Sequence, residues 1–197
     1  TVIITIYISA SAGYVLSKKH FKFRRSLFKI NQMALMFVPV AVQIPRFFII
    51  VATGLQDNFL ANIIPLLATP TCVFLVKQFI DQLPDALIEA AVIDGATDIA
   101  IMRKIIMPLI RSPLSTVAIL TFQSSWNSVE SSTYYINNDS LKTFSFYVST
   151  LSNQSGNVVA GKGITAAATL IMFLPSLILF IILQSRVMNS MAHSGIK

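Results

Sequence analysis

Residues that could carry out chemistry are few in this chain and are widely spaced. The 197 residues include two histidines, one cysteine and eight acidic residues. His20 and His193 have no Cys, Asp or Glu at the spacing of metal ligands, and Cys72 lies alone in an apolar run. No Ser/His/Asp or Cys/His arrangement for nucleophilic catalysis is visible either. We therefore expect neither an enzyme nor a metal-binding protein.

One glycine-rich segment resembles a phosphate-binding loop without completing it. Gly156, Gly161 and Lys162 have the G-x4-G-K spacing of such loops. Gly163 then stands where a Ser or Thr would hold Mg²⁺, and no convincing strand leads into the segment. We predict that this chain itself binds no nucleotide and no other cofactor.

Four polar or aromatic residues in apolar surroundings are candidates for a solute path. Arg46 and Gln43 interrupt an apolar stretch, where an ionisable side chain is costly enough to indicate function. Arg46 could line a path and donate to hydroxyls, or it could extend to the membrane surface or connect helices. Trp126 and Asn127 end another apolar stretch, where the indole could stack on a sugar ring or fix the helix at the interface.

The most informative polar segment is the loop of residues 81–107. Pro84 suits the first position of a helix, and Asp85 would complement the positive end of that helix. Gly95 is placed to end the helix in a left-handed conformation, and Thr97 can cap a second short helix. The spacing therefore predicts a helix-turn-helix.

This predicted helix would have one apolar stripe beside an acidic edge. At 100° per residue, Asp85 and Glu89 lie together at that edge. The stripe beside them comprises Leu87, Ile88, Ala91 and Val92. An apolar face with an acidic edge is a surface that another protein can bind.

The composition around this loop is that of a membrane protein. Apolar residues make up 54% of the chain, only 12% is charged, and the mean hydropathy is +0.71. A span needs about 20 mostly apolar residues. We expect an all-α polytopic transmembrane bundle that forms a single domain over residues 1–197. The chain begins inside an apolar run, so we expect a further span upstream of five spans at about 1–16, 30–54, 59–80, 105–126 and 164–183.

The basic residues orient these predicted spans. If the first span ends on the inside, twelve of the fifteen Lys and Arg residues fall on the inner side and two on the outer side. Six of the twelve lie in residues 18–29. The loop 81–107 and the C-terminus would then be cytoplasmic, and residues 127–162 would face outward. A juxtamembrane block also explains the net charge of +7, so we do not expect nucleic-acid binding.

The loop carries a family resemblance. Glu89-Ala90-Ala91, then Gly95, then Ile105 and Pro108 have the spacing of the EAA motif, E-A-A-x3-G-x9-I-x-L-P, of ABC importer permeases. Met107 replaces the motif's Leu, which conserves volume. Asp94 and the flanking residues 74–79, together with Trp126 and Asn127, resemble the carbohydrate branch of that family and its MalG-like subunits.

The resemblance implies a fold, a function and partners. It implies a MalF/MalG-like permease fold in a bacterial cytoplasmic membrane and import of sugars or oligosaccharides, with Glu89, Ala90, Ala91, Asp94, Gly95, Ile105 and Pro108 in a coupling loop that docks on an ATPase. The implied partners are a second, paralogous permease subunit, two ATP-binding subunits that hold ATP and magnesium, an extracytoplasmic solute-binding protein and the lipid bilayer. From the predicted topology we also expect segment 127–162 to face the binding protein and the tail from Arg186 to Lys197 to reach the ATPase.

Two alternatives stay open from the sequence. One is an ABC importer permease for another small solute, such as a glycerol phosphate ester, which would keep the loop without the Trp126-Asn127 context. The other is an ion-driven secondary transporter, which would show a buried carboxylate or histidine within a span. Asp57, Asp81 and Glu130 all fall at or outside the predicted span ends, which favours the importer.

Overall fold

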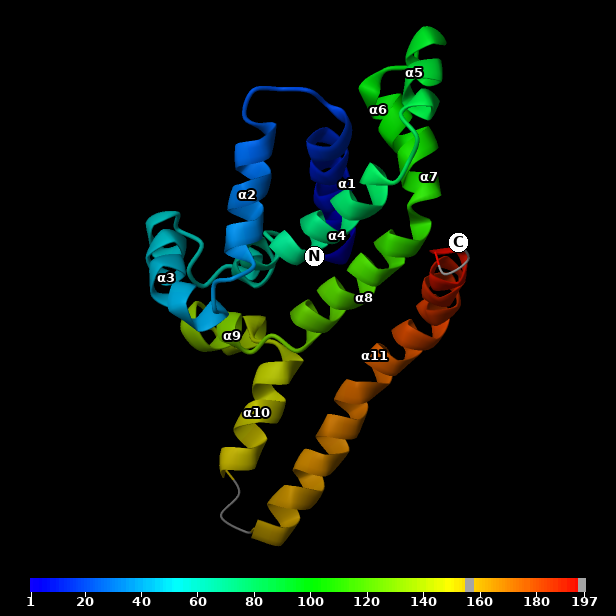
Figure 1. Cartoon of the computed structure of the whole chain (residues 1–197). Helices are drawn as coiled ribbons and strands as arrows, with labels where there is room; N and C mark the ends of the chain where they lie inside the picture. Colours follow the sequence, from blue (N-terminus) through cyan, green and yellow to red (C-terminus); the bar gives the residue numbers. More distant parts are fainter. Residues whose placement is uncertain (155–157, 195–197) are drawn as a thin grey trace. The chain divides into compact units, whose positions relative to one another are not determined.

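The computed structural model describes residues 1–154 and 158–194, with the side chains of 1–151 and 161–184, and the described part is all helical (Figure 1). This confirms the all-α prediction. The chain divides into two compact units, each described by itself below. The first unit holds Thr1, Val38–Leu66 and Thr121–Ile182, and the second holds Val2–Phe37, Leu67–Leu120 and Leu183–Lys197.

The second unit is built on α1 (Val2–Lys18) and α4 (Pro70–Asp81), which pack along each other. Small residues recur every fourth position on the buried side of α1, at Thr5, Ser9, Gly13 and Ser17. A Cβ added to Gly13 would lie 2.9 Å from Val76 Cγ1 and 3.2 Å from the Lys77 backbone nitrogen. Small side chains at this spacing let two helix backbones approach closely, as they do in membrane helix pairs.

Shorter helices complete the second unit. They are α2 (Arg24–Ala34), α5 (Ala86–Ile93), α6 (Asp98–Ile101), the π-helical turn Met102–Ile106, α7 (Met107–Leu109) and the first part of α8 (Arg111–Trp126). Their apolar core gathers residues that are far apart in the sequence. It includes Tyr14, Val76, Ile80, Ala91, Ile101, Met102, Ile106 and Val117.

The first unit has its own smaller core of Ile50, Ala61, Tyr135 and Ile136. Its helical elements are the 3₁₀ turns Pro39–Val42, Phe59–Asn62, Ile64–Leu66 and Asp139–Leu141, the helices α3 (Gln43–Ala52), α9 (Glu130–Tyr134) and α10 (Phe144–Gln154), the last turns of α8 and most of α11 (Val158–Ser194). Pro39 and Pro70 each begin a new helical element after a break, because proline cannot continue the preceding hydrogen-bond ladder.

Within the described residues, one helix is long and apolar enough by itself to cross a membrane. This stretch, Gly161–Gln184 of α11, contains the predicted span 164–183. Three bent helix pairs would raise the number to four if each pair were one span: Arg24–Ala34 with Pro39–Ala52, Phe59–Leu66 with Pro70–Asp81, and Asp98–Leu109 with Arg111–Tyr134. The predicted span 1–16 coincides with the shorter apolar helix α1. The exact set of spans stays a prediction.

Candidate functional site

The loop predicted to carry function forms a helical hairpin of α5 and α6 (Figure 1). Gly95 has φ +76° at the turn, as predicted for a left-handed end of α5. Thr97 Oγ1 accepts a hydrogen bond from the Ala100 N–H at 3.4 Å, as predicted for the cap of α6. The predicted start at Pro84 is wrong by two residues, because Pro84 and Asp85 form the turn that precedes α5.

The predicted apolar stripe of α5 is only partly covered. Ala91 is buried and Ile88 is half-buried against the core, whereas Leu87 is 43% and Val92 54% exposed. The hairpin therefore packs through the middle of its stripe and leaves both margins of the stripe exposed. Further apolar side chains project from the same hairpin, with Ile93 85% exposed. Several uncovered apolar side chains on one short hairpin are typical of a binding surface.

The polar residues of the motif lie on the open side of the hairpin. Glu89, Ala90, Asp94 and Gly95 are all exposed. In the part of the chain that the structure describes, the Glu89 carboxylate takes part in no hydrogen bond or ion pair. Because a carboxylate without an internal partner is free to bind a cation of another molecule, Glu89 is available for such a contact.

The motif's second half follows at a widened helical turn. The Met107 N–H donates to the Met102 carbonyl oxygen, five residues back, in a π-helical turn that precedes Pro108. Ile105 is half-buried against the core and Ile106 is 1% exposed. Single π turns are frequent at functional sites. The structure thus places Glu89, Ala90, Asp94 and Gly95 at the surface and buries Ala91. Ile105 and Pro108 lie in the element that leads from the hairpin into α8.

The end of α1 is bound to the hairpin by ion pairs that the sequence analysis missed. Lys18 Nζ lies 2.6 Å from Asp85 Oδ1 and 2.6 Å from the Leu83 carbonyl oxygen, and its side chain is only 7% exposed. Lys19 Nζ lies 2.5 Å from Asp98 Oδ1. We call the pairs Lys18–Asp85 and Lys19–Asp98 the anchor pairs. They join the end of α1 to the turn that precedes α5 and to the start of α6.

Each anchor pair shifts the pKa of one of its members. The Lys18 ammonium, through its hydrogen bond and its charge, holds the pKa of the Asp85 carboxyl below its usual value. The hydrogen bond to Asp98 raises the pKa of Lys19. The Asp85 carboxylate and the Lys19 ammonium are therefore charged at neutral pH. A signal for them was present in the sequence, because basic residues directly follow α1 and acidic residues stand at the start of each short helix.

The solute-path candidates Gln43 and Arg46 lie in α3, in the first unit. Gln43 begins the helix and is half-buried. Arg46 Nη1 lies 3.6 Å from Glu130 Oε2 of α9. This ion pair connects helices α3 and α9. A place for Gln43 and Arg46 in the solute path stays a prediction.

Trp126 and Asn127 lie at the end of α8, in the same unit. The Trp126 indole stacks on Phe122 with ring centroids 5.8 Å apart, and its Nε1–H donates to the Met172 carbonyl oxygen at 2.9 Å. The Asn127 side chain is exposed. The indole is thus held by the protein on one face and at its nitrogen, and its role toward a solute stays a prediction.

Other candidate chemistry is sparse in the described residues. They contain no group of three or more His, Cys, Asp or Glu side chains that could hold a metal ion. Gly156 of the glycine-rich segment lies outside the described residues, as do the side chains of the tail from Arg186 to Lys197.

Comparison with known proteins decides the family. A family model described as "Binding-protein-dependent transport system inner membrane component" matches residues 6–189. The chain belongs to this family. It is therefore a membrane protein and a transport subunit of an ABC importer, and in such systems a separate subunit hydrolyses ATP. Importers of this family comprise a partner permease, ATPase subunits and a solute-binding protein.

Individual relatives agree with this assignment. The arabinooligosaccharides transport system permease protein AraQ of Halalkalibacterium halodurans is 29% identical over 196 residues, which cover 100% of this chain and 69% of AraQ. The sn-glycerol-3-phosphate transport system permease protein UgpE of Salmonella choleraesuis is 28% identical, with 96% of this chain and 67% of UgpE covered.

A solved structure confirms the permease fold. A chain from a bacterial ABC transporter involved in the import of the acidic polysaccharide alginate superposes with a TM-score of 0.81 at 21% identity, over 93% of this chain and 69% of that one. At this sequence identity, the superposition shows that the two chains share a fold.

Proposed function

We propose that this chain is a permease subunit of an importer for sugars or oligosaccharides, and that the hairpin α5–α6 couples it to the ATPase. The observation that carries the proposal is the hairpin's outer surface. Leu87, Val92 and Ile93 of α5 are 43%, 54% and 85% exposed there, and the Glu89 carboxylate has no hydrogen bond or ion pair among the residues that the structure describes. Apolar side chains beside one charge would fit a cleft on a partner protein that has a basic rim.

The anchor pairs provide a route from the hairpin to a membrane helix. When the ATPase subunits close on ATP, a seated hairpin moves with them. Lys18 and Lys19 would pass this movement to α1, and Ala91, Ile101 and Met102 would pass it to the core against α4. Because packed cores and ion pairs resist deformation, the movement reaches the spans rather than dissipating in the loop.

The proposed assembly follows the orientation given by the basic residues. Residues 81–107 and the C-terminus are cytoplasmic, and segment 127–162, of which 155–157 lie outside the described residues, faces outward. The partners are a paralogous permease, two ATPase subunits that bind ATP and magnesium, and an extracytoplasmic solute-binding protein. Gln43, Arg46, Trp126 and Asn127 are the residues we propose for the solute path.

The relatives' names support a carbohydrate as cargo. They include two arabinooligosaccharide permeases, a sulfoquinovosyl glycerol permease and a lactose permease. A glycerol phosphate ester is the second candidate, because UgpE is nearly as similar as the sugar permeases. Competition between labelled oligosaccharides and glycerol 3-phosphate for uptake separates the two.

The test is solute-stimulated ATP hydrolysis and uptake by the complete importer reconstituted in liposomes. Glu89→Lys reverses the charge of the proposed docking surface, and Gly95→Pro prevents the turn at φ +76°. Lys29→Glu is the control, because it also reverses one charge at an exposed side chain, in α2 rather than in the hairpin. Gly54→Pro is a matched control at a glycine with φ +68° and open surroundings.

Both hairpin variants should lose ATP hydrolysis and uptake together while the membrane subunits still assemble. In both controls, ATP hydrolysis should still drive uptake. Uptake that persists in the hairpin variants and is indifferent to ATP would contradict the proposal, and would favour an ion-driven carrier.

A further inference from the structure

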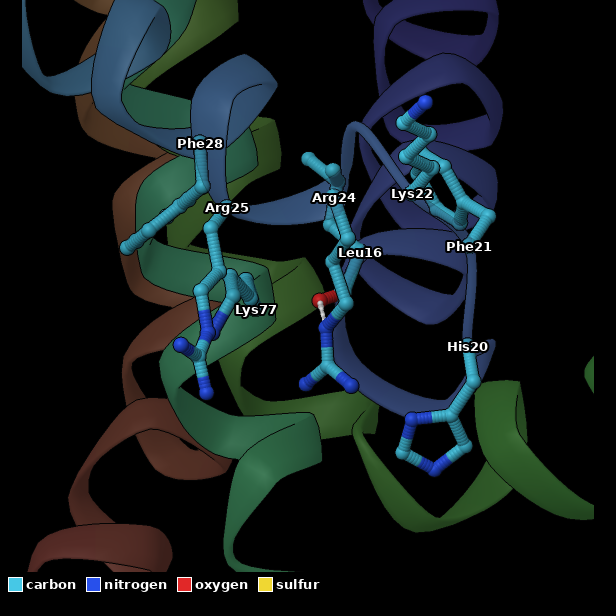
Figure 2. Close-up of a pocket in the computed structure, with 8 residues that line it drawn as sticks. All are labelled: Leu16, His20, Phe21, Lys22, Arg24, Arg25, Phe28 and Lys77. Atoms are coloured by element: carbon cyan, nitrogen blue, oxygen red, sulfur yellow. Dashed lines mark hydrogen bonds between the residues drawn. The ribbon is translucent and has the colours of Figure 1, made fainter.

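A cavity of about 730 Å³ lies in the second unit between the end of α1, the start of α2 and α4 (Figure 2). Five basic residues line it: His20, Lys22, Arg24, Arg25 and Lys77. The rest of its lining is apolar and consists of Leu16, Phe21 and Phe28. No carboxylate of the described residues contributes to this lining. A cavity with cations and apolar side chains, and without acidic residues, selects an anion that carries an apolar group.

The nearest carboxylates of the described residues, Asp81 and Asp85, are affected by the charge of Arg24 but form no ion pair with either arginine. Asp81 accepts hydrogen bonds from Lys77 Nζ at 2.5 Å and from Ser17 Oγ at 2.6 Å, and Asp85 is paired with Lys18. Within the described ranges 1–154 and 158–194, Arg24 and Arg25 form no ion pair. Arg24 Nε donates only to the Leu16 carbonyl oxygen at 2.8 Å, which leaves its terminal N–H groups available.

The start of α2 adds a third positive contribution. Arg24 and Arg25 occupy its first turn, which contains no acidic residue, and no side chain caps it. The positive end of a helix disfavours cations beside it and favours an anion. Figure 2 shows the two arginine side chains extending in the same direction from this turn, whereas Lys22 extends the other way. An anion between the guanidinium groups would reduce the repulsion between the two arginines. It would also reduce the repulsion between these arginines and the positive end of α2.

The apolar lining indicates which anion. Leu16 ends the predicted first span, so the cavity would lie at the cytoplasmic surface of the bilayer. Phe21 is 38% exposed, and Phe28 stacks on Phe74 with centroids 6.0 Å apart. A free phosphate ion would gain nothing from these side chains, whereas the glycerol backbone and first methylene groups of a lipid would cover them.

We propose that this cavity binds the phosphate of an anionic phospholipid headgroup through Arg24 and Arg25. Guanidinium groups match the geometry of phosphate oxygens and form paired hydrogen bonds with them. The proposal rests on the membrane orientation given above but not on the coupling role of the hairpin. A bound lipid would hold the end of α1, and with it the anchor pairs, at the membrane surface.

The test titrates the purified importer in detergent with water-soluble dihexanoyl phosphatidylglycerol, dihexanoyl phosphatidylcholine and inorganic phosphate. The variant Arg24→Gln with Arg25→Gln removes the two proposed ligands. Lys29→Gln with Lys104→Gln is the matched control, because it removes two exposed charges that do not line the cavity. Arg24→Lys with Arg25→Lys keeps the charge and loses the forked geometry.

We expect the native chain to bind phosphatidylglycerol more tightly than phosphatidylcholine or phosphate. The double Gln variant should bind it about 30-fold more weakly, from the typical attraction of two basic residues at a membrane surface. The lysine variant should fall between the two, and the control should resemble the native chain. An equal loss in the control, or native binding of inorganic phosphate as tight as that of the lipid, overturns the proposal. The native comparison of the three ligands tests it even if a variant fails to fold.

Discussion

The hairpin α5–α6 and the segment 128–143 are both polar insertions between apolar stretches, but they treat their polar groups in opposite ways. The hairpin is fixed at its base by the anchor pairs and leaves its tip open. Ile93 and Ile99 are 85% and 65% exposed, and Glu89 is unpaired within the described residues. Segment 128–143 instead uses its polar groups to close on its own unit.

The closure of segment 128–143 depends on Asp57. The Asp57 carboxylate accepts from the Asn138 N–H at 3.0 Å and from the Asn137 side chain at 3.1 Å, and it also accepts from the Asn137 N–H. Its own N–H donates to the Tyr135 carbonyl oxygen at 2.9 Å. Asp57 has φ +55°, an uncommon conformation for a non-glycine residue, and these bonds stabilise it.

The contrast separates a surface made for a partner from a surface made for the fold. Polar groups that find partners inside their own unit report on stability, and those left open beside exposed apolar side chains report on binding. This criterion supports our proposal that the hairpin is the docking element. The prediction that segment 127–162 meets the solute-binding protein stays a prediction.

The strongest way to break the hairpin's support is at Gly13. Gly13→Leu would force side-chain atoms into Val76 and the Lys77 backbone, because a Cβ alone already approaches them to 2.9 and 3.2 Å. We expect a loss of about 3 kcal/mol or more, measured as the thermal unfolding midpoint and as recovery of assembled importer. Gly163→Leu, where no atom lies within 4 Å of the added Cβ, should behave like the native chain. Equal stability of the two variants would show that α1 and α4 are not closely packed.

A smaller change tests the anchor pairs. Lys18→Met removes the bonds to both Asp85 and the Leu83 carbonyl oxygen, whereas Asp85→Asn removes the charge of one partner. We expect uptake per ATP hydrolysed to fall about tenfold for Lys18→Met and less for Asp85→Asn. The double variant should be no worse than Lys18→Met alone, because both changes affect one interaction. Fully additive losses would show that the two residues act separately.

The smallest effect is expected at Asp57, in the closed segment. Donation by the Asn138 and Asn137 backbone N–H groups holds the pKa of the Asp57 carboxyl below its ordinary value of 3.8. Its stabilisation is therefore complete above that ordinary value and is lost as the pH falls through the lower folded pKa. Asp57→Asn should raise hydrogen exchange at the Asn137 and Asn138 amides at neutral pH without changing uptake. Asp139→Asn is the matched control, and loss of transport in Asp57→Asn alone would give the segment a direct role.

The comparison of sequence with structure is most instructive within the hairpin. The turn at Gly95 and the cap at Thr97 were predictable because each depends on one residue type and its immediate neighbours. The start of α5 was not, because Asp85 extends to Lys18, 67 residues away, rather than serving its own helix. The stripe on α5 was predicted as one apolar face, yet Leu87 and Val92 are uncovered, since only contacts with other helices decide which part of a stripe is buried.

The sequence by itself determined the all-α class, the family and the position of the motif, because composition, helical periodicity and the spacing from Glu89 to Pro108 are local properties of the chain. Only the tertiary structure decided that Lys18 and Lys19 bind the hairpin, that Gly13 lets α1 approach α4, and that Arg24 and Arg25 share a cavity without a carboxylate in its lining. The physical reason is that ion pairs and close packing depend on which distant residues become neighbours. A block of basic residues therefore has the same sequence pattern whether its charges are paired, solvated or arranged around a cavity.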